Sequence, residues 1–157
     1  DIMGCGKADG GGILPVSFVA GRNDVIGTLT PGSEGSTFGG YPLASVVGIY
    51  AIKTLIEENL TQNAKIRGAQ LMQHFENLKN DFPDKIKEVR GKGLLTAFEM
   101  HDSDKLDGHI ISMELLKNGI YAKETHHSTV RIAPALTVNE SHINQLGEKI
   151  WQVVSKL

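Results

Sequence analysis

Residues 93–100, Gly93-Leu94-Leu95-Thr96-Ala97-Phe98-Glu99-Met100, form a mostly apolar run of the length of one β-strand. Apolar residues recur at helical spacing on both sides of this run, at Leu71, Phe75 and Leu78 upstream and at Ile111 and Leu115 downstream. A strand between two amphipathic helices is typical of a chain that alternates helix and strand. The sequence therefore predicts an α/β fold in this region.

The same alternation continues to the end of the chain. Pro83 is expected to end the upstream helix, and Asn118-Gly119 the downstream one. Short strands are predicted at residues 120–122 and 129–133. The clearest helix comes last, behind a possible capping box of Thr137 and Glu140. Its apolar stripe consists of Ile143, Leu146, Ile150, Val153 and Leu157. We expect residues 61–157 to form a small α/β domain.

The first sixty residues have a different character. They are rich in glycine, with a buried strand predicted over residues 13–20 and an exposed loop over residues 31–35. Pro42 is well placed to begin a helix that reaches the polar break at residues 57–59. Because the sequence starts on Asp-Ile-Met rather than on methionine, we expect it to be a piece of a longer protein.

Composition narrows the classes of partner. The chain has 157 residues, of which 40% are hydrophobic and 22% charged, and its formal net charge is −2. This charge gives no reason to expect nucleic acid, and no apolar run is long enough to cross a membrane. Cys5, the single cysteine, has no partner for an internal disulfide.

Lys7 is the first candidate for chemistry because glycines surround it, in Gly4-Cys5-Gly6-Lys7-Ala8. A phosphate-binding P-loop needs a hydroxyl after the lysine, but Ala8 follows. A dinucleotide fingerprint needs glycine where Asp9 stands. Burial of the amine in a tight turn would favour its neutral form, which attacks aldehydes. Taken alone, the signal is weak, since most lysines are solvated surface groups.

Two further segments contain polar groups in unusual settings. Ser36 and Thr37 precede the Pro42 helix in a glycine-rich loop, where hydroxyls and backbone N–H groups suit a phosphate; an ordinary loop is the alternative. Arg131 is a charge inside an apolar stretch, so either a substrate carboxylate or an internal salt bridge would balance it. His126-His127 does not have the spacing of a metal site, and we predict no metal.

Four segments together resemble one family in the same order. They are Gly6-Lys7-Ala8 with Pro15-Val16-Ser17, then residues 35–43, residues 89–95, and residues 122–136. This pattern resembles the class III aminotransferases, which depend on pyridoxal 5′-phosphate (PLP), and within them most of all the ornithine aminotransferases. The resemblance covers essentially the whole chain. Tyr41 departs from it, because the family commonly has asparagine there.

The resemblance implies a fold and a site. The fold would be the C-terminal part of the PLP-dependent transferase type I fold, with residues 1–60 ending the large domain and residues 61–157 forming the small α/β domain. Lys7 would be the catalytic, cofactor-bearing lysine, and Ser36 and Thr37 would bind the cofactor phosphate of the neighbouring subunit. Arg131 would bind a substrate carboxylate. The family's homodimer, with an active site shared between subunits, would then be part of the chemistry.

The implied reaction transfers an ω-amino group, most simply from ornithine to 2-oxoglutarate, giving glutamate 5-semialdehyde and glutamate. An acetylornithine or γ-aminobutyrate aminotransferase is one alternative, and a non-catalytic α/β interaction domain is another. The family's acidic partner of the cofactor ring nitrogen should precede the lysine, and only six residues do. We therefore expect this polypeptide alone to be inactive. The implied compartment is the cytoplasm in a bacterium and the mitochondrial matrix in a eukaryote.

Overall fold

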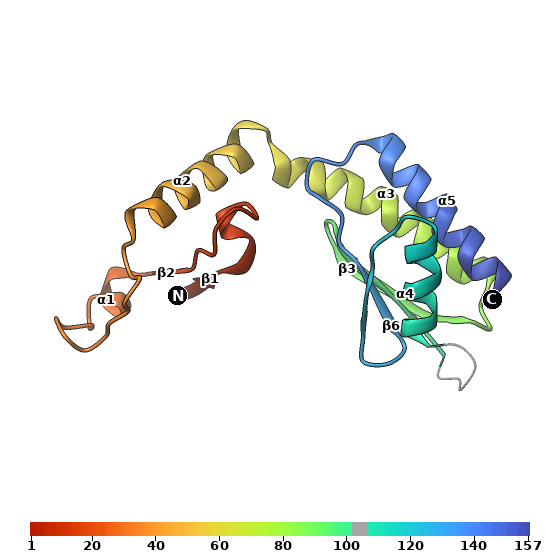
Figure 1. The fold of residues 1–157 in the computed structure, drawn as a ribbon, viewed down its shortest axis with the longest axis horizontal. Helices are drawn as coiled ribbons and strands as arrows, with labels where there is room; N and C mark the ends of the chain where they lie inside the picture. The colour runs from red at the N-terminus through yellow and green to blue at the C-terminus, as the bar shows by residue number, and fades with distance from the viewer. Residues whose placement is uncertain (102–106) are drawn as a thin grey trace. The chain divides into compact units, whose positions relative to one another are not determined.

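The computed structural model describes residues 1–101 and 107–157. These residues form two compact units, Asp1–Asn59 and Leu60–Leu157. Both appear in Figure 1, with the first unit in red to yellow and the second in yellow-green to blue. That these units are the end of a large domain and a small α/β domain stays a prediction.

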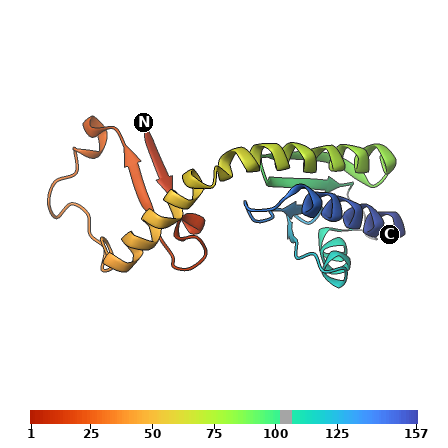
Figure 2. The same cartoon turned by 90° about the horizontal axis from the view of Figure 1, so that it is seen from above.

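The second unit is built on a four-stranded antiparallel sheet with the strand order β3-β4-β6-β5. The strands are β3 (Ile86–Lys92), β4 (Leu95–Met100), β5 (Lys123–Thr125) and β6 (Thr129–Ile132). The helices are α3 (Leu60–Asp81), α4 (Gly108–Lys117) and α5 (Glu140–Lys156). Helices α3 and α5 run side by side (Figures 1 and 2), tied by the hydrogen bond from Gln70 Nε2 to Asn144 Oδ1 at 2.7 Å. The predicted α/β character is confirmed.

The core of this unit lies between the helices and one face of the sheet. Phe75 of α3 meets Phe98 of β4 edge to face, with ring centroids 5.4 Å apart, and both side chains are fully buried. The predicted helical stripes supply half of the remaining buried core, namely Leu71, Leu78, Ile111, Leu115, Ile143, Ile150 and Val153. Burial of these side chains is the main force that holds the unit together.

Two sequence predictions in this unit are wrong in detail. The capping box of α5 is formed by Asn139 and His142, whose backbone N–H bonds to Asn139 Oδ1 at 2.9 Å, and not by Thr137 and Glu140. Histidine thus takes the place that glutamate has in the usual box. The strand expected at residues 120–122 begins instead at Lys123, because those residues complete the turn after α4.

The first unit contains a hairpin and one long helix. Strands β1 (Ile2–Cys5) and β2 (Phe18–Gly21) pair antiparallel, and the 3₁₀ turn η1 (Lys7–Gly10) follows β1. A short helix, α1 (Asn23–Ile26), precedes the loop to α2 (Pro42–Glu57), which begins at Pro42 as predicted. The buried strand expected over residues 13–20 is wrong, since β2 begins at Phe18 and all four of its residues are exposed.

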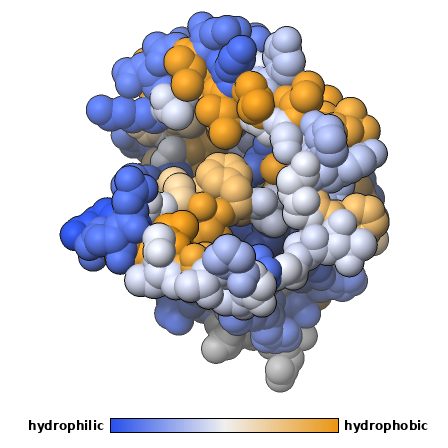
Figure 3. All heavy atoms as spheres, turned by 90° about the vertical axis from the view of Figure 1, so that its left-hand side faces the viewer, coloured by the Kyte–Doolittle hydropathy of each residue, from blue (hydrophilic) through white to orange (hydrophobic). Residues whose placement is uncertain are grey.

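Apolar side chains of this unit are left at the surface. Gly10 and Gly48 are its only buried residues, so it has no hydrophobic core of its own in the described part of the chain. Orange, apolar residues surround a hollow on the face shown in Figure 3. Several of them belong to α2, among them Val46, Ile49 and Ile56, which are 50%, 52% and 73% exposed. Surfaces of this kind are usually covered by other protein.

Candidate active site

Lys7 occupies a strained backbone position at the end of β1. Its φ is 61°, in the left-handed region that residues other than glycine rarely adopt, and Gly6 before it is fully extended. The turn closes through the Gly11 N–H, which donates to the Ala8 carbonyl oxygen at 2.9 Å. The Lys7 side chain is exposed, so the described residues do not supply the water-poor environment that its chemistry would favour. Backbone strain of this kind is concentrated at functional sites in proteins.

Close packing fixes the lysine turn against α2. Val16 lies between Gly10 of the turn and Gly48 of the helix, and a Cβ at either glycine would approach a Val16 methyl group to 3.2 Å. These two small residues explain why η1 can lie against α2. Gly10 therefore has a packing role in addition to shaping the turn.

Ser36 and Thr37 lie in an exposed turn that leads into α2. The turn is held by backbone bonds from Gly39 N–H to the Ser36 carbonyl at 3.1 Å and from Tyr41 N–H to the Phe38 carbonyl at 3.2 Å. Neither hydroxyl bonds to another residue in the described ranges 1–101 and 107–157. Two free hydroxyls therefore stand in one turn, as a phosphate-binding loop requires.

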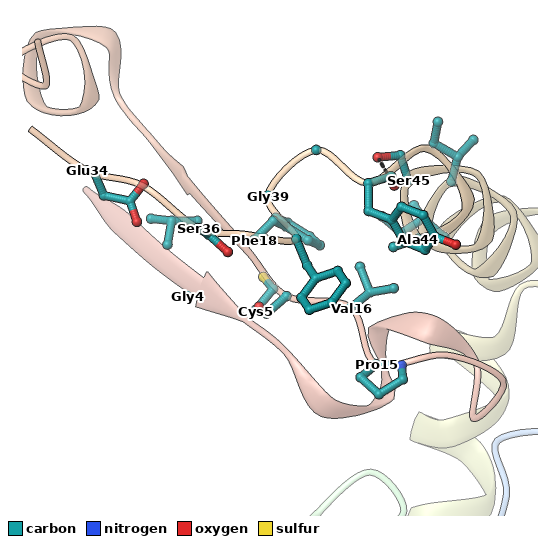
Figure 4. A pocket seen from close by; sticks show the side chains of 18 of the residues that line it. Gly4, Cys5, Pro15, Val16, Phe18, Glu34, Ser36, Gly39, Ala44 and Ser45 are labelled. Atoms are coloured by element: carbon teal, nitrogen blue, oxygen red, sulfur yellow. Dashed lines mark hydrogen bonds between the residues drawn. The ribbon is translucent and has the colours of Figure 1, made fainter. Parts of the chain in front are cut away.

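A hollow of about 1070 Å³ separates this loop from the hairpin. Cys5 of β1, Phe18 of β2, Ser36 of the loop and Ala44 of α2 all line it, and Figure 4 shows them converging from their separate segments. The structure thus brings Ser36 to the same hollow as the strand that leads to Lys7. Lys7 and Thr37 do not line it.

Arg131 belongs to the second unit and lies on β6. Val130 and Ile132 beside it are buried, 0% and 3% exposed, whereas Arg131 is exposed on the opposite face of the sheet. The sequence suggested a charge buried in an apolar stretch, and this is wrong because neighbouring residues of a strand point to opposite faces. The Arg131 side chain has no ion pair or hydrogen bond with the residues that the structure describes, so the internal salt bridge weighed from sequence is not found there.

A charged cluster on the same sheet face was not anticipated from the sequence. Glu99 of β4 accepts from Lys87 Nζ and from Arg90 Nη1, each at 2.7 Å. These hydrogen bonds, with Lys87 the larger effect and Arg90 the next, lower the pKa of Glu99 to about 2. The available signal was the charged residues Lys87, Glu88 and Arg90 in one segment and Glu99 in the next, but strand register was needed to pair them.

The described residues contain no metal site and no membrane-spanning helix. No group of histidine, cysteine, aspartate and glutamate in residues 1–101 and 107–157 is arranged to hold a metal ion. His126 and His127 occupy the turn between β5 and β6, both with positive φ, and both are exposed. No helix within those ranges is long and apolar enough to cross a bilayer.

Comparisons with known proteins extend over nearly the whole chain. The family model described as aminotransferase class III matches residues 1–154. The mitochondrial ornithine aminotransferase of Arabidopsis thaliana is 36% identical over 98% of this chain and 33% of its own length. That of Staphylococcus epidermidis is 41% identical over 98% of this chain and 37% of its own.

Solved structures agree with the sequence relatives. The acetylornithine aminotransferase of Elizabethkingia anophelis is 35% identical with a TM-score of 0.92, over 100% of this chain and 41% of its own. The ornithine aminotransferase of Toxoplasma gondii is 37% identical with a TM-score of 0.92, over 99% of this chain and 37% of its own.

The fold is therefore that of part of a PLP-dependent aminotransferase. The chain belongs to the class III aminotransferase family. It spans about a third of the length of the curated relatives that it matches, between 33% and 38%.

Proposed function

We propose that this chain supplies the cofactor lysine, part of the cofactor phosphate site and the carboxylate-binding arginine of an ornithine aminotransferase. The proposed reaction moves the ω-amino group of ornithine to 2-oxoglutarate. Because the chain spans about a third of the length of its relatives, Lys7, Ser36, Thr37 and Arg131 would be only part of the site.

The observation that carries the proposal is the backbone of Lys7. A lysine with φ of 61° between an extended glycine and a 3₁₀ turn is held in a conformation that costs about 1–2 kcal/mol. A surface lysine without a role has no reason to be held there, because glycine would fit without strain. Strain at this residue is what a fixed attachment point for a cofactor aldehyde would require.

The loop residues fit the phosphate of PLP. Ser36 and Thr37 present hydroxyls with no partner within the described residues, in a turn immediately before the N-terminus of α2. Hydroxyl and backbone N–H donors at such a place suit a phosphate group. By the family resemblance this phosphate belongs to the partner subunit's cofactor, so we infer a homodimer with a shared active site.

Arg131 fits the carboxylate of the substrate. Its guanidinium is exposed on the sheet face, and no carboxylate among the described residues neutralises it. A planar guanidinium can bind a carboxylate through two parallel hydrogen bonds, which fixes the orientation of the substrate as well as its position.

The division of labour between protein and cofactor follows from these residues. PLP, when bound, supplies an aldehyde that accepts the amino group and an electron-withdrawing ring. The Lys7 amine would hold the cofactor through its aldehyde and would move the proton at the substrate carbon. Arg131 holds the substrate by its carboxylate during that transfer.

Acetylornithine is the second candidate substrate, because one of the best structural matches is an acetylornithine aminotransferase. Ornithine is preferred because relatives of this name recur at 36–41% identity among plant and bacterial proteins. The compartment proposed is the cytoplasm for a bacterial source and the mitochondrial matrix for a eukaryotic one.

Covalent trapping tests the assignment of Lys7. The chain would be mixed with excess PLP, reduced with borohydride, digested and mapped by mass spectrometry. We expect an adduct at Lys7 and its loss in Lys7→Ala. Lys53→Ala is the matched control, since Lys53 is an exposed lysine of the same unit and its removal should leave the adduct in place. An adduct at another lysine with Lys7 unlabelled would refute the proposal.

Competition with amino donors separates the two substrates in a longer protein that contains the rest of the site. Ornithine and N-acetylornithine would be added in parallel to that protein, with PLP bound and free PLP removed, before reduction. We expect ornithine to protect Lys7 from labelling at the lower concentration. Stronger protection by N-acetylornithine would favour the second candidate while leaving the role of Lys7 intact.

A further inference from the structure

A row of cations crosses the open face of the second unit's sheet. In the strand register Arg90 of β3 stands opposite Ala97 of β4, Ala97 opposite Arg131 of β6, and Arg131 opposite Lys123 of β5. Arg131 is on the face away from the core, and cross-strand partners share a face, so all of these residues do. The row thus contains three cations. Arg131 and Lys123 are direct neighbours, and Ala97 stands between Arg90 and Arg131.

The cations of this row differ in how they are neutralised. Arg90 Nη1 lies 2.7 Å from Glu99 Oε2 and 3.5 Å from Glu88 Oε2. Lys123 Nζ lies 3.6 Å from Glu124 Oε1. Arg131 has no such neighbour in the part of the chain that the structure describes. The middle cation of the row is therefore the one left available to a ligand.

Glu99 is the residue that neutralises Arg90, the cation that β3 contributes to the row. Its two oxygens are divided between Lys87 and Arg90, and its side chain is only 17% exposed. Thr129 beside it on β6 is 4% exposed, and Arg90 Nη2 lies 3.4 Å from its hydroxyl. The Arg90 guanidinium is thus drawn along β4 toward Glu99 and Thr129, away from the row that it shares with Arg131.

We propose that Glu99 is a selectivity residue that engages Lys87 and Arg90 and thereby confines carboxylate binding on this sheet face to Arg131. The inference rests on the proposed function, in which Arg131 receives the substrate carboxylate. Its consequence is a defined ligand class. The face accepts one carboxylate of an amino acid or 2-oxo acid, and it offers no second free guanidinium to the other end of a dicarboxylate.

The charge of Glu99 persists under the conditions in which the site would work. The pKa of Glu99 is lowered to about 2 by hydrogen bonds from Lys87 and Arg90, so the carboxylate is ionised at neutral pH. Arg90 is charged at any such pH, and its pKa is raised, first by the hydrogen bond with Glu99. Arg90 therefore remains engaged and does not compete with Arg131.

Arginine side-chain NMR of the full chain tests the proposal directly. The Nε–Hε signals of Arg90 and Arg131 would be followed while glutarate is added at pH 7. In the unaltered chain we expect the Arg131 signal to move and the Arg90 signal to stay. In Glu99→Gln the Arg90 signal should move as well, because the ion pair that engages its guanidinium has been lost.

Two variants serve as controls. Glu88→Gln removes a carboxylate charge from the same sheet face but leaves the 2.7 Å contact between Arg90 and Glu99, so the Arg90 signal should stay. Glu99→Asp keeps the charge with a shorter reach, so Arg90 should respond weakly. If Glu99→Gln fails to fold, Glu99→Asp and the unaltered chain still decide the matter.

The outcomes separate this proposal from the function on which it rests. An Arg90 signal that moves in the unaltered chain as much as that of Arg131 overturns the role of Glu99. So does an Arg90 signal that stays still in Glu99→Gln. An Arg131 signal that does not move in the unaltered chain contradicts the proposed carboxylate site instead. The effect of Glu99→Gln on Arg90 is measured from the Arg90 signal and does not depend on that result.

Discussion

Gly68, in the middle of α3, packs directly against the backbone of Gly93, the residue that turns the chain from β3 into β4. A Cβ at residue 68 would overlap the Gly93 carbonyl group. Gly93 itself has φ of 56°, so the turn also depends on its lack of a side chain. The contact fixes how the hairpin that bears Arg90 and Glu99 docks on its helix.

Gly68→Ala should destabilise the second unit by about 2–3 kcal/mol, because the new methyl group overpacks a contact with rigid backbone. Helix propensity works in the other direction, since alanine is favoured over glycine by about 1 kcal/mol. A net loss of unfolding free energy would therefore be due to the steric overlap and not to helix propensity. Urea unfolding followed by fluorescence of Trp151, the single tryptophan, would measure it. Gln62→Ala, at an exposed position of α3, is the control and should change little; an unchanged midpoint for Gly68→Ala would contradict the contact.

The cap of α5 gives a second prediction. Asn139→Ala should lower the free energy of unfolding by about 1 kcal/mol, because it removes the acceptor for the His142 N–H. Thr137→Ala should leave stability unchanged, since the box seen in the structure does not include Thr137. Thermal unfolding of the two variants in parallel would decide between the cap in the structure and the one expected from sequence. Equal losses would contradict this assignment.

The core could be predicted from the sequence because helical periodicity is a local property. Leu71, Phe75, Ile111 and Ile143 all lie in the core, as their spacing predicted. The position of β2 could not be derived in this way. Its pairing with β1 is set by a turn of several glycines, and apolar residues from Ile13 to Val16 read as strand although they lie in turn and coil. Period-two patterns that short do not distinguish a strand from a packed loop.

Candidate site residues could be proposed from the sequence, but the electrostatics around them could not. Lys7, Ser36, Thr37 and Arg131 were each identified by type and neighbours, and their roles remain proposals. The strain at Lys7 is a backbone property that no pattern of residues reveals. The hydrogen bond between Arg90 and Glu99 depends on strand register. These residues are nine apart in the sequence, and the hairpin turn between β3 and β4 sets their register.

The Glu99 cluster predicts a specific pH dependence of stability. The pKa of Glu99 is about 2 in the folded chain, below its usual value of 4.5, so the stabilisation from its charge is fully present above about pH 4.5. It is lost as pH falls through 2, when the folded state also takes up the proton. Because the pair is partly solvated, the contribution should be about 1 kcal/mol.

The measurement compares the unaltered chain with Glu99→Gln in urea from pH 7 to pH 2. The difference in unfolding free energy should be constant from pH 7 to about 5 and then shrink toward zero near pH 2. Glu148→Gln, at an exposed position of α5, should show no such trend. A difference between the unaltered chain and Glu99→Gln that does not vary with pH would mean that Glu99 contributes by packing and not by charge.

The strain at Lys7 gives the last prediction. Lys7→Gly should stabilise the η1 turn relative to Lys7→Ala by about 1 kcal/mol, because glycine adopts φ of 61° without the steric cost of a Cβ. Hydrogen exchange of the Gly11 amide, which donates to the Ala8 carbonyl, reports on this turn directly. A difference of 1 kcal/mol corresponds to about five-fold slower exchange in the glycine variant. Ala8→Gly is the matched control and should speed exchange, since residue 8 does not require a positive φ. Both Lys7 variants should lose the PLP adduct equally, so a more stable turn without the amine would show that the conformation is retained for the lysine and not for the fold.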